Sequence, residues 1–164
     1  MKSIIVKICK ILLSILDKRE NSAISRYDDL YKQLQTQEGL RLKLYKCTAG
    51  KLTIGIGHNI EDRGITERHA IIIFKDDVES CIKDVKNCIS FYNKLDHVRQ
   101  DILINMTFNI GIKRLLKFKK MLTALESGDY KTAYKEMLDS KWHEQVGNRA
   151  EELSIQMLKG EYND

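Results

Sequence analysis

The stretch Glu38-Gly-Leu-Arg-Leu-Lys-Leu-Tyr-Lys-Cys47-Thr-Ala-Gly-Lys-Leu-Thr53-Ile-Gly-Ile-Gly-His58 decides the fold of this chain and carries its chemistry. Eight residues separate Glu38 from Cys47, and five separate Cys47 from Thr53. The three side chains offer a carboxyl, a thiol and a hydroxyl, which can serve as a proton donor, as a nucleophile or base, and as a holder of water. The spacing predicts that all three gather around one short β-hairpin.

Two alternating segments flank a turn within this stretch. Residues 41–47 and 52–56 alternate between apolar and polar side chains, as half-buried strands do, and Thr48-Ala49-Gly50 has the composition of a turn. A turn centred on Gly50 would place Cys47 directly opposite Thr53. We therefore expect the thiol and the hydroxyl to face each other across the hairpin.

Glu38 is expected in the last turn of a helix, because apolar residues recur at a helical period from Ile24 to about Gln37 and Gly39 is a natural stop. The negative end of the helix dipole disfavours an ionised carboxylate there, and a general acid must keep its proton. Taken alone, a helix-end Glu is more often solvated, and a cysteine is more often buried and inert. Only Glu38, Cys47 and Thr53 in combination therefore indicate a catalytic site.

The rest of the chain is predicted to be helical, with Thr66 as an N-cap and with Gly111, Gly128 and Gly160 as helix stops. The expected helices cover residues 66–91, 95–110, 115–127, 129–140 and 148–160. The core positions expected on the first of them are Ile73, Val78, Ile82, Val85 and Ile89. We expect an α+β, mostly helical fold, in which a small β-hairpin lobe joins a larger helical lobe with a cleft between them.

Residues 1–16 form an apolar segment with Lys7 and Lys10 on one side and Cys9 on the other. The segment is shorter than the roughly 20 residues of a membrane span, and no signal-peptidase site follows it. Two interpretations stay open. An uncleaved export anchor would tether the protein to the inner membrane and place it in the periplasm of a bacterial host. An amphipathic helix would instead pack on the domain or on a membrane surface, and without an export signal the protein would be cytoplasmic. Residues 1–23 are expected to be a segment and linker before a domain of residues 24–164.

Charge and cysteine spacing exclude several classes of function. The net charge is +5, much of it in the N-terminal 35 residues, and no nucleic-acid-binding motif is present, so no nucleic-acid partner is expected. The four cysteines contain no Cys-x-x-Cys pair, which argues against a zinc site. We predict no metal and no cofactor, and we expect a monomer.

The motifs together resemble the bacteriophage endolysin lysozymes, glycoside hydrolase family 24. The resemblance rests on the Glu38 to His58 stretch with its Thr-Ile-Gly-Ile-Gly-His ending. It continues through Gly64-Ile-Thr66, Leu95-Asp-His-Val-Arg99, Asn105-Met-Thr-Phe108-Asn-Ile-Gly111, Ser140-Lys-Trp142 and Asn148-Arg149-Ala150. It covers residues 27 to 162.

The resemblance implies roles for individual residues. Glu38 takes the part of the general acid, Cys47 stands where Asp is the common residue, and Thr53 matches the Thr that helps to position the attacking water. The positions that contact substrate in the family fall on Phe108, Asn59, Met121 and Glu136, and the last three differ in residue type. The family's structural residues fall on His58 and Asp77, as an ion pair, and on Arg149 near the catalytic Glu.

The implied reaction is hydrolysis of the β-1,4 bond from N-acetylmuramic acid to N-acetylglucosamine in peptidoglycan glycan strands, which lyses the host cell. A cysteine at position 47 resembles a signal-anchor-release subgroup, in which a disulfide traps the catalytic Cys until the N-terminal segment leaves the membrane. Cys9 lies in the matching kind of segment, so Cys9 and Cys47 are the predicted redox pair. The blocking Cys of that subgroup is missing, since residues 36–46 contain none.

One alternative function stays open. The missing Asp at position 47 would also suit a catalytically inactive peptidoglycan-binding protein on a lysozyme fold. Glu38, Thr53 and the intact glycine-rich hairpin favour the enzyme.

Overall fold

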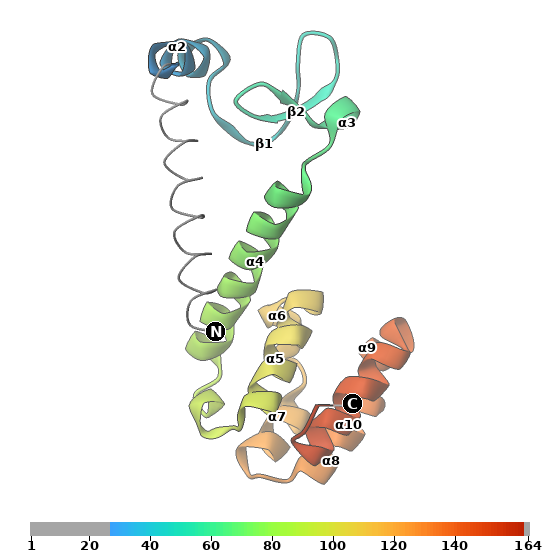
Figure 1. Cartoon of the computed structure of the whole chain (residues 1–164). Coiled ribbons are helices and arrows are strands. Elements are labelled where there is room, and N and C mark those ends of the chain that lie inside the picture. The colour runs from blue at the N-terminus through green and yellow to red at the C-terminus, as the bar shows by residue number, and fades with distance from the viewer. Residues whose placement is uncertain (1–26, 163–164) are drawn as a thin grey trace, which may run out of the picture. The chain divides into compact units, whose positions relative to one another are not determined.

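The computed structural model describes residues 27–162, and these form two compact units that divide between Thr66 and Glu67. The hairpin unit holds α2, the strands and α3, drawn in blue to green in Figure 1. The helical unit holds α4 to α10. An α+β fold that is mostly helical, with one small hairpin unit and one larger helical unit, is therefore confirmed. The N-terminal segment, the 23/24 boundary and Cys9 lie outside the described residues.

The hairpin unit begins with α2 (Asp28–Glu38), which ends at Gly39 with a φ of 67°. That positive φ suits a residue without a Cβ, and the Gly39 N–H donates to the Gln35 carbonyl at 2.9 Å. The predicted helix stop is confirmed, and Glu38 is the last helical residue.

A three-stranded antiparallel sheet follows α2. It consists of β1 (Arg41–Lys46), β2 (Leu52–Gly55) and β3 (His58–Asn59), in the order β1-β2-β3. The strand β3 was not predicted, because two residues are too short to show an alternating pattern. The short helix α3 (Ile60–Arg63) continues from β3, and the Asn59 side chain caps it by accepting the Asp62 N–H.

The register of the hairpin corrects one prediction. Thr53 pairs with Tyr45, and Lys46 pairs with Leu52, so the turn is centred on Ala49 and not on Gly50. The Cys47 N–H donates to the Lys51 carbonyl at 3.0 Å, which closes the turn. Cys47 therefore lies at the turn and not opposite Thr53. The turn residues were correct, but composition does not show on which residue a turn is centred.

The helical unit has a continuous apolar core around α5 (His97–Ile110), in which Ile102, Leu103 and Met106 are fully buried. Its other elements are α4 (Glu67–Cys88), the 3₁₀ helix η1 (Tyr92–Lys94), α6 (Ile112–Leu115), α7 (Lys119–Glu126), α8 (Tyr130–Leu138), α9 (Lys141–Val146) and α10 (Asn148–Lys159). Fully buried side chains from four of these helices complete the core: Leu115, Met121, Leu125, Met137 and Met157.

Three details of the helical unit differ from prediction. The helix expected over residues 115–127 begins only at Lys119, as α7, and Leu115 instead ends the short helix α6. The segment contains no Gly or Pro, but Leu115 and Met121 on either side of the turn are both fully buried, so packing rather than propensity sets the break. The six-residue α9 was not predicted. Val85 on α4 and Ile89 directly after it belong to the core as expected, whereas Ile73 on α4 is 50% exposed.

Arg99 ties the end of α10 to α5. Its side chain is buried, donates to the carbonyls of Met157 and Leu158 at 2.9 and 3.1 Å, and lies 3.4 Å from the centroid of the Tyr130 ring. Gly160 ends α10, and a Cβ there would lie 2.5 Å from an Arg99 nitrogen. Burial acts to raise the pKa of Asp96, but hydrogen bonds from Arg99 outweigh it and lower that pKa.

Within residues 27–162, no helix is both long enough and apolar enough to cross a bilayer.

Candidate active site

Glu38, Cys47 and Thr53 all belong to the hairpin unit, and the geometry around each can be described within that unit. The Glu38 side chain lies against the turn between β2 and β3. A Cβ on Gly57 would lie 2.8 Å from Glu38 Oε2 and 3.0 Å from its carboxyl carbon, and Gly57 has a φ of 68°. Only glycine satisfies both the backbone conformation and the close approach of the carboxyl group.

Cys47 is a half-buried free thiol at the start of the turn. Backbone hydrogen bonds from Lys51 and then Ala49 lower the pKa of this thiol, burial opposes them, and the Thr53 hydroxyl adds to the lowering. The thiolate, which is the nucleophilic and basic form of cysteine, is therefore favoured here relative to an ordinary cysteine. Cys47, Cys81 and Cys88 are all free, so no disulfide is present among the described residues.

Thr53 is 2% exposed, and its hydroxyl donates to the Lys51 carbonyl at 3.1 Å. The same carbonyl accepts the Cys47 N–H, so one backbone oxygen orients both residues. A hydroxyl that donates to a carbonyl keeps lone pairs with which to accept from a water molecule. The thiol and the hydroxyl therefore meet around Lys51, although they do not pair across the strands.

Lys51 is itself held by two carboxylates, which the sequence analysis did not identify. Its Nζ lies 2.9 Å from Asp62 and 3.3 Å from Glu61, and the second Glu61 oxygen accepts the Leu52 N–H at 2.9 Å. The hydrogen bond that Lys51 donates to Asp62, and then the one to Glu61, raises the pKa of Lys51, and the bond to Asp62 also lowers the pKa of Asp62. We call Lys51, Glu61 and Asp62 the turn clamp. The sequence does contain a signal for this cluster, because a basic residue in the turn is followed ten and eleven residues later by two acidic residues.

His58 and Asn59 also have partners inside the hairpin unit. His58 Nε2 lies 2.7 Å from the Gly64 carbonyl, and Asn59 Nδ2 donates to Asp62 at 2.9 Å. The expected His58–Asp77 ion pair and the expected substrate contact of Asn59 stay predictions.

Four other predicted residues belong to the helical unit, where they line two separate hollows. Phe108 and Arg149 line a hollow of about 360 Å³. Phe108 meets Phe74 edge to face, with ring centroids 5.7 Å apart. Arg149 donates two hydrogen bonds, of 2.6 and 3.1 Å, to the Asn105 side-chain oxygen. Asn105 was quoted in the motif, yet no role was predicted for it.

Met121 and Glu136 line a second hollow of about 980 Å³, in which Met121 is fully buried and Glu136 lies 3.9 Å from Lys120. The substrate-binding roles of these residues stay predictions.

The fold and the hairpin chemistry define a class: a glycoside hydrolase of the lysozyme type. Its hairpin unit carries a carboxyl at the end of α2, a thiol in the turn after β1 and a hydroxyl on β2. A family model described as "Phage lysozyme" matches residues 35–156. The chain therefore belongs to the phage lysozyme family.

Two relatives carry names that agree with this assignment, and a third relative is a larger protein with a similar segment. The "Probable T4-type lysozyme 1" of Dictyostelium discoideum is 29% identical and covers 79% of this chain and 94% of its own length. An "Endolysin" of Acyrthosiphon pisum secondary endosymbiont phage 1 is 33% identical over 66% of this chain and 73% of its own length. The "Pre-baseplate central spike protein Gp5" of Enterobacteria phage T4 is 32% identical over 79% of this chain, which spans only 27% of the spike protein.

Proposed function

We propose that this protein hydrolyses the β-1,4 bond from N-acetylmuramic acid to N-acetylglucosamine in peptidoglycan and so lyses a bacterial cell, acting as a monomer. Glu38 protonates the leaving glycosidic oxygen. The Cys47 thiolate either attacks the anomeric carbon or takes a proton from a water molecule that Thr53 holds. The observation that carries the proposal is the Lys51 carbonyl, which orients the Cys47 and Thr53 groups together.

The proposal is tested by clearing of permeabilised Gram-negative cells, followed as turbidity. Glu38→Gln removes the proton donor and is expected to slow clearing by about 10²–10⁴-fold. Glu126→Gln, an equal change at the end of α7, is the control and should clear at the parent rate. If neither the parent protein nor the control clears cells, with or without reductant, the enzyme proposal is rejected.

Substitutions of Cys47 test whether its side chain takes part in the reaction. Cys47→Ser replaces the thiol with a much weaker acid and nucleophile, while Cys47→Asp restores the residue that is common in the family. We expect the serine variant to lose most of the activity and the aspartate variant to keep it. Full activity in Cys47→Ser would show that the thiol is not required, and that Glu38 acts with only Thr53 and a water molecule.

The feature that favours the alternative function is Cys47 itself, since it stands where a carboxylate is common. A catalytically inactive peptidoglycan-binding protein would sediment with purified cell-wall sacculi but release no reducing sugar from them. Release of reducing sugar that depends on Glu38 would reject this alternative.

We further propose that residues 1–16 direct export to the periplasm with a membrane-tethered stage, and that a disulfide between Cys9 and Cys47 holds the enzyme inactive there. Thiol–disulfide exchange is chemically sufficient to release Cys47. Non-reducing peptide mapping of the exported protein should find the Cys9–Cys47 peptide pair, and Cys9→Ser should clear cells without reductant. Equal activity of the parent with and without reductant would reject the lock. Full-length protein should fractionate with membranes, and a chain that starts near Ser22 should not.

A further inference from the structure

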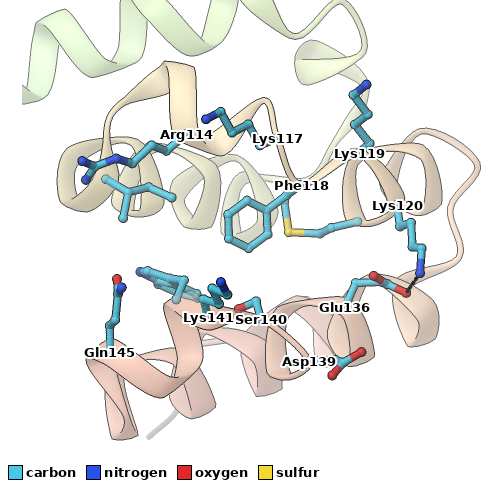
Figure 2. A pocket seen from close by; sticks show the side chains of 13 residues that line it. Arg114, Lys117, Phe118, Lys119, Lys120, Glu136, Asp139, Ser140, Lys141 and Gln145 are labelled. Atoms are coloured by element: carbon cyan, nitrogen blue, oxygen red, sulfur yellow. Dashed lines mark ion pairs between the residues drawn. The ribbon is translucent and has the colours of Figure 1, made fainter.

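The larger hollow of the helical unit combines an apolar floor with a strongly basic rim. Its volume is about 980 Å³, and it is formed by the segment around α6 and α7 and by the segment from the end of α8 through α9. Phe118 and Trp142 meet edge to face in it, with ring centroids 6.4 Å apart. A hydrogen bond of 2.8 Å from Trp142 Nε1 to Asn109 fixes the indole ring. Figure 2 shows Phe118 pointing into the space between the two segments.

Five basic side chains surround this hollow, and we call them the cationic rim: Arg114, Lys117, Lys119, Lys120 and Lys141. Only two acids, Glu136 and Asp139, line the same hollow, so its net charge is +3. Lys120 lies 3.9 Å from Glu136, the ion pair that is dashed in Figure 2. The other four cations are exposed and have no ion pair with any residue of the described part of the chain.

The break between α6 and α7 gathers this charge. Residues 111–125 contain five basic residues and no acidic one. In one continuous helix, these side chains would follow each other at 100° intervals around the axis, and several would point away from the hollow. Because the chain turns at Leu116–Phe118, cations from two short helices border one concavity (Figure 2).

We propose that this hollow binds a phosphorylated glycan of the bacterial envelope. Ammonium and guanidinium groups are the usual partners of phosphate oxygens. The half-buried Phe118 ring offers apolar surface to sugar C–H groups, over the buried Trp142. The excess of cations over acids favours a ligand with several negative charges. Met121 and Glu136, which the resemblance assigns to substrate binding, line the same hollow, so the proposal adds a phosphate-bearing ligand to that predicted contact surface. It requires neither Glu38 nor Cys47, and its test reads binding and not clearing, so it can fail separately from the proposed hydrolysis.

The physical character of the site predicts how binding depends on salt. Each exposed ion pair contributes little by itself and is screened by salt, so binding requires several cations at once. Affinity should therefore fall steeply as ionic strength rises.

Trp142 makes the test specific, because it lines the hollow and is the only tryptophan of the chain. Full-length protein is titrated with phosphomannan, with unphosphorylated mannan and with polygalacturonate, and tryptophan fluorescence is followed. We expect a saturable change with phosphomannan that weakens with added salt. Mannan and polygalacturonate should bind about tenfold more weakly or not at all. No saturable change with phosphomannan, or equal binding of polygalacturonate, would overturn the proposal.

Matched charge variants then locate the site. The triple variant Lys117→Gln, Lys119→Gln, Lys141→Gln removes three cations of the rim, and Lys75→Gln, Lys86→Gln, Lys94→Gln removes three exposed cations that do not line the hollow. The rim variant should lose affinity for phosphomannan by about tenfold, and the control should keep it. Equal losses in both would show attraction by overall charge and reject the site. Because all six side chains are exposed, thermal midpoints near that of the parent should confirm that both variants fold.

Discussion

The hairpin unit and the helical unit are built by different physical means. In the helical unit, apolar side chains from seven α-helices and η1 form one buried core. Among the described residues of the hairpin unit, the one fully buried side chain is that of Thr53, and Leu42 is 81% exposed. Turn hydrogen bonds, glycines at positive φ and the turn clamp order this unit instead. The residues proposed for catalysis lie where polar contacts, rather than burial, set the geometry.

The largest effect should come from a cavity in the helical core. Leu103→Ala removes a fully buried side chain and is expected to lower the free energy of unfolding by about 2–5 kcal/mol. Leu42→Ala, the same change at an exposed position of β1, should alter it by no more than about 0.5 kcal/mol. Urea unfolding followed by circular dichroism measures both. Similar losses would contradict the contrast between the two units.

In the hairpin unit, we expect a substitution next to Glu38 to lower the rate of cell clearing. Gly57→Ala places a methyl group against the Glu38 carboxyl, and a displacement of about 1 Å can cost on the order of 100-fold in rate. Gly50→Ala is the matched control, because Gly50 also has a positive φ, of 78°, but nothing lies within 4 Å of its added Cβ. Both variants pay about 1–2 kcal/mol for the left-handed backbone. Only Gly57→Ala should slow clearing strongly at equal folded fraction.

A smaller effect concerns acid stability of the helical unit. The pKa of Asp96 is lowered in the folded protein, so its bond to Arg99 stabilises the fold above the ordinary carboxyl value of 3.8 and is lost as pH falls through the folded value. Because Asp96 is partly exposed, we expect this contribution to be about 1 kcal/mol. Asp96→Asn should therefore unfold at a lower urea concentration at pH 7, and the difference should shrink toward pH 3. A constant difference would contradict this assignment.

The last prediction compares one thiol from each unit. Hydrogen bonds from Lys51 and Ala49 lower the pKa of Cys47, whereas burial and then Asp84 and Asp77 raise the pKa of Cys81. Alkylation by iodoacetamide, read by peptide mapping of the reduced full chain, should therefore rise at a lower pH for Cys47.

The turn clamp gives this comparison a control. In Glu61→Gln/Asp62→Asn, the partners of Lys51 are lost, and the pH profile of Cys47 should change while that of Cys81 stays as it was. If both profiles stay unchanged, the clamp does not govern the environment of Cys47.

Several features of the candidate site were predictable because they depend on local chemistry. Gly39 marks the end of α2, since the stop requires a positive φ, and Glu38 follows from that stop. The strands β1 and β2 follow from alternation around a turn sequence. The roles of Asn105 and the turn clamp were missed, because a hydrogen bond between distant residues has no periodic signal.

The sequence alone determined where α2 ends and to which family the chain belongs, and it predicted which residues carry the chemistry. These properties follow from residue type and from spacing along the chain. Tertiary structure decided that Cys47 meets Thr53 through the Lys51 carbonyl, that α6 and α7 separate, and that the basic rim encloses one hollow. The first depends on the exact register of the hairpin, and the other two depend on how side chains from different elements pack together, which the order of the residues does not state directly.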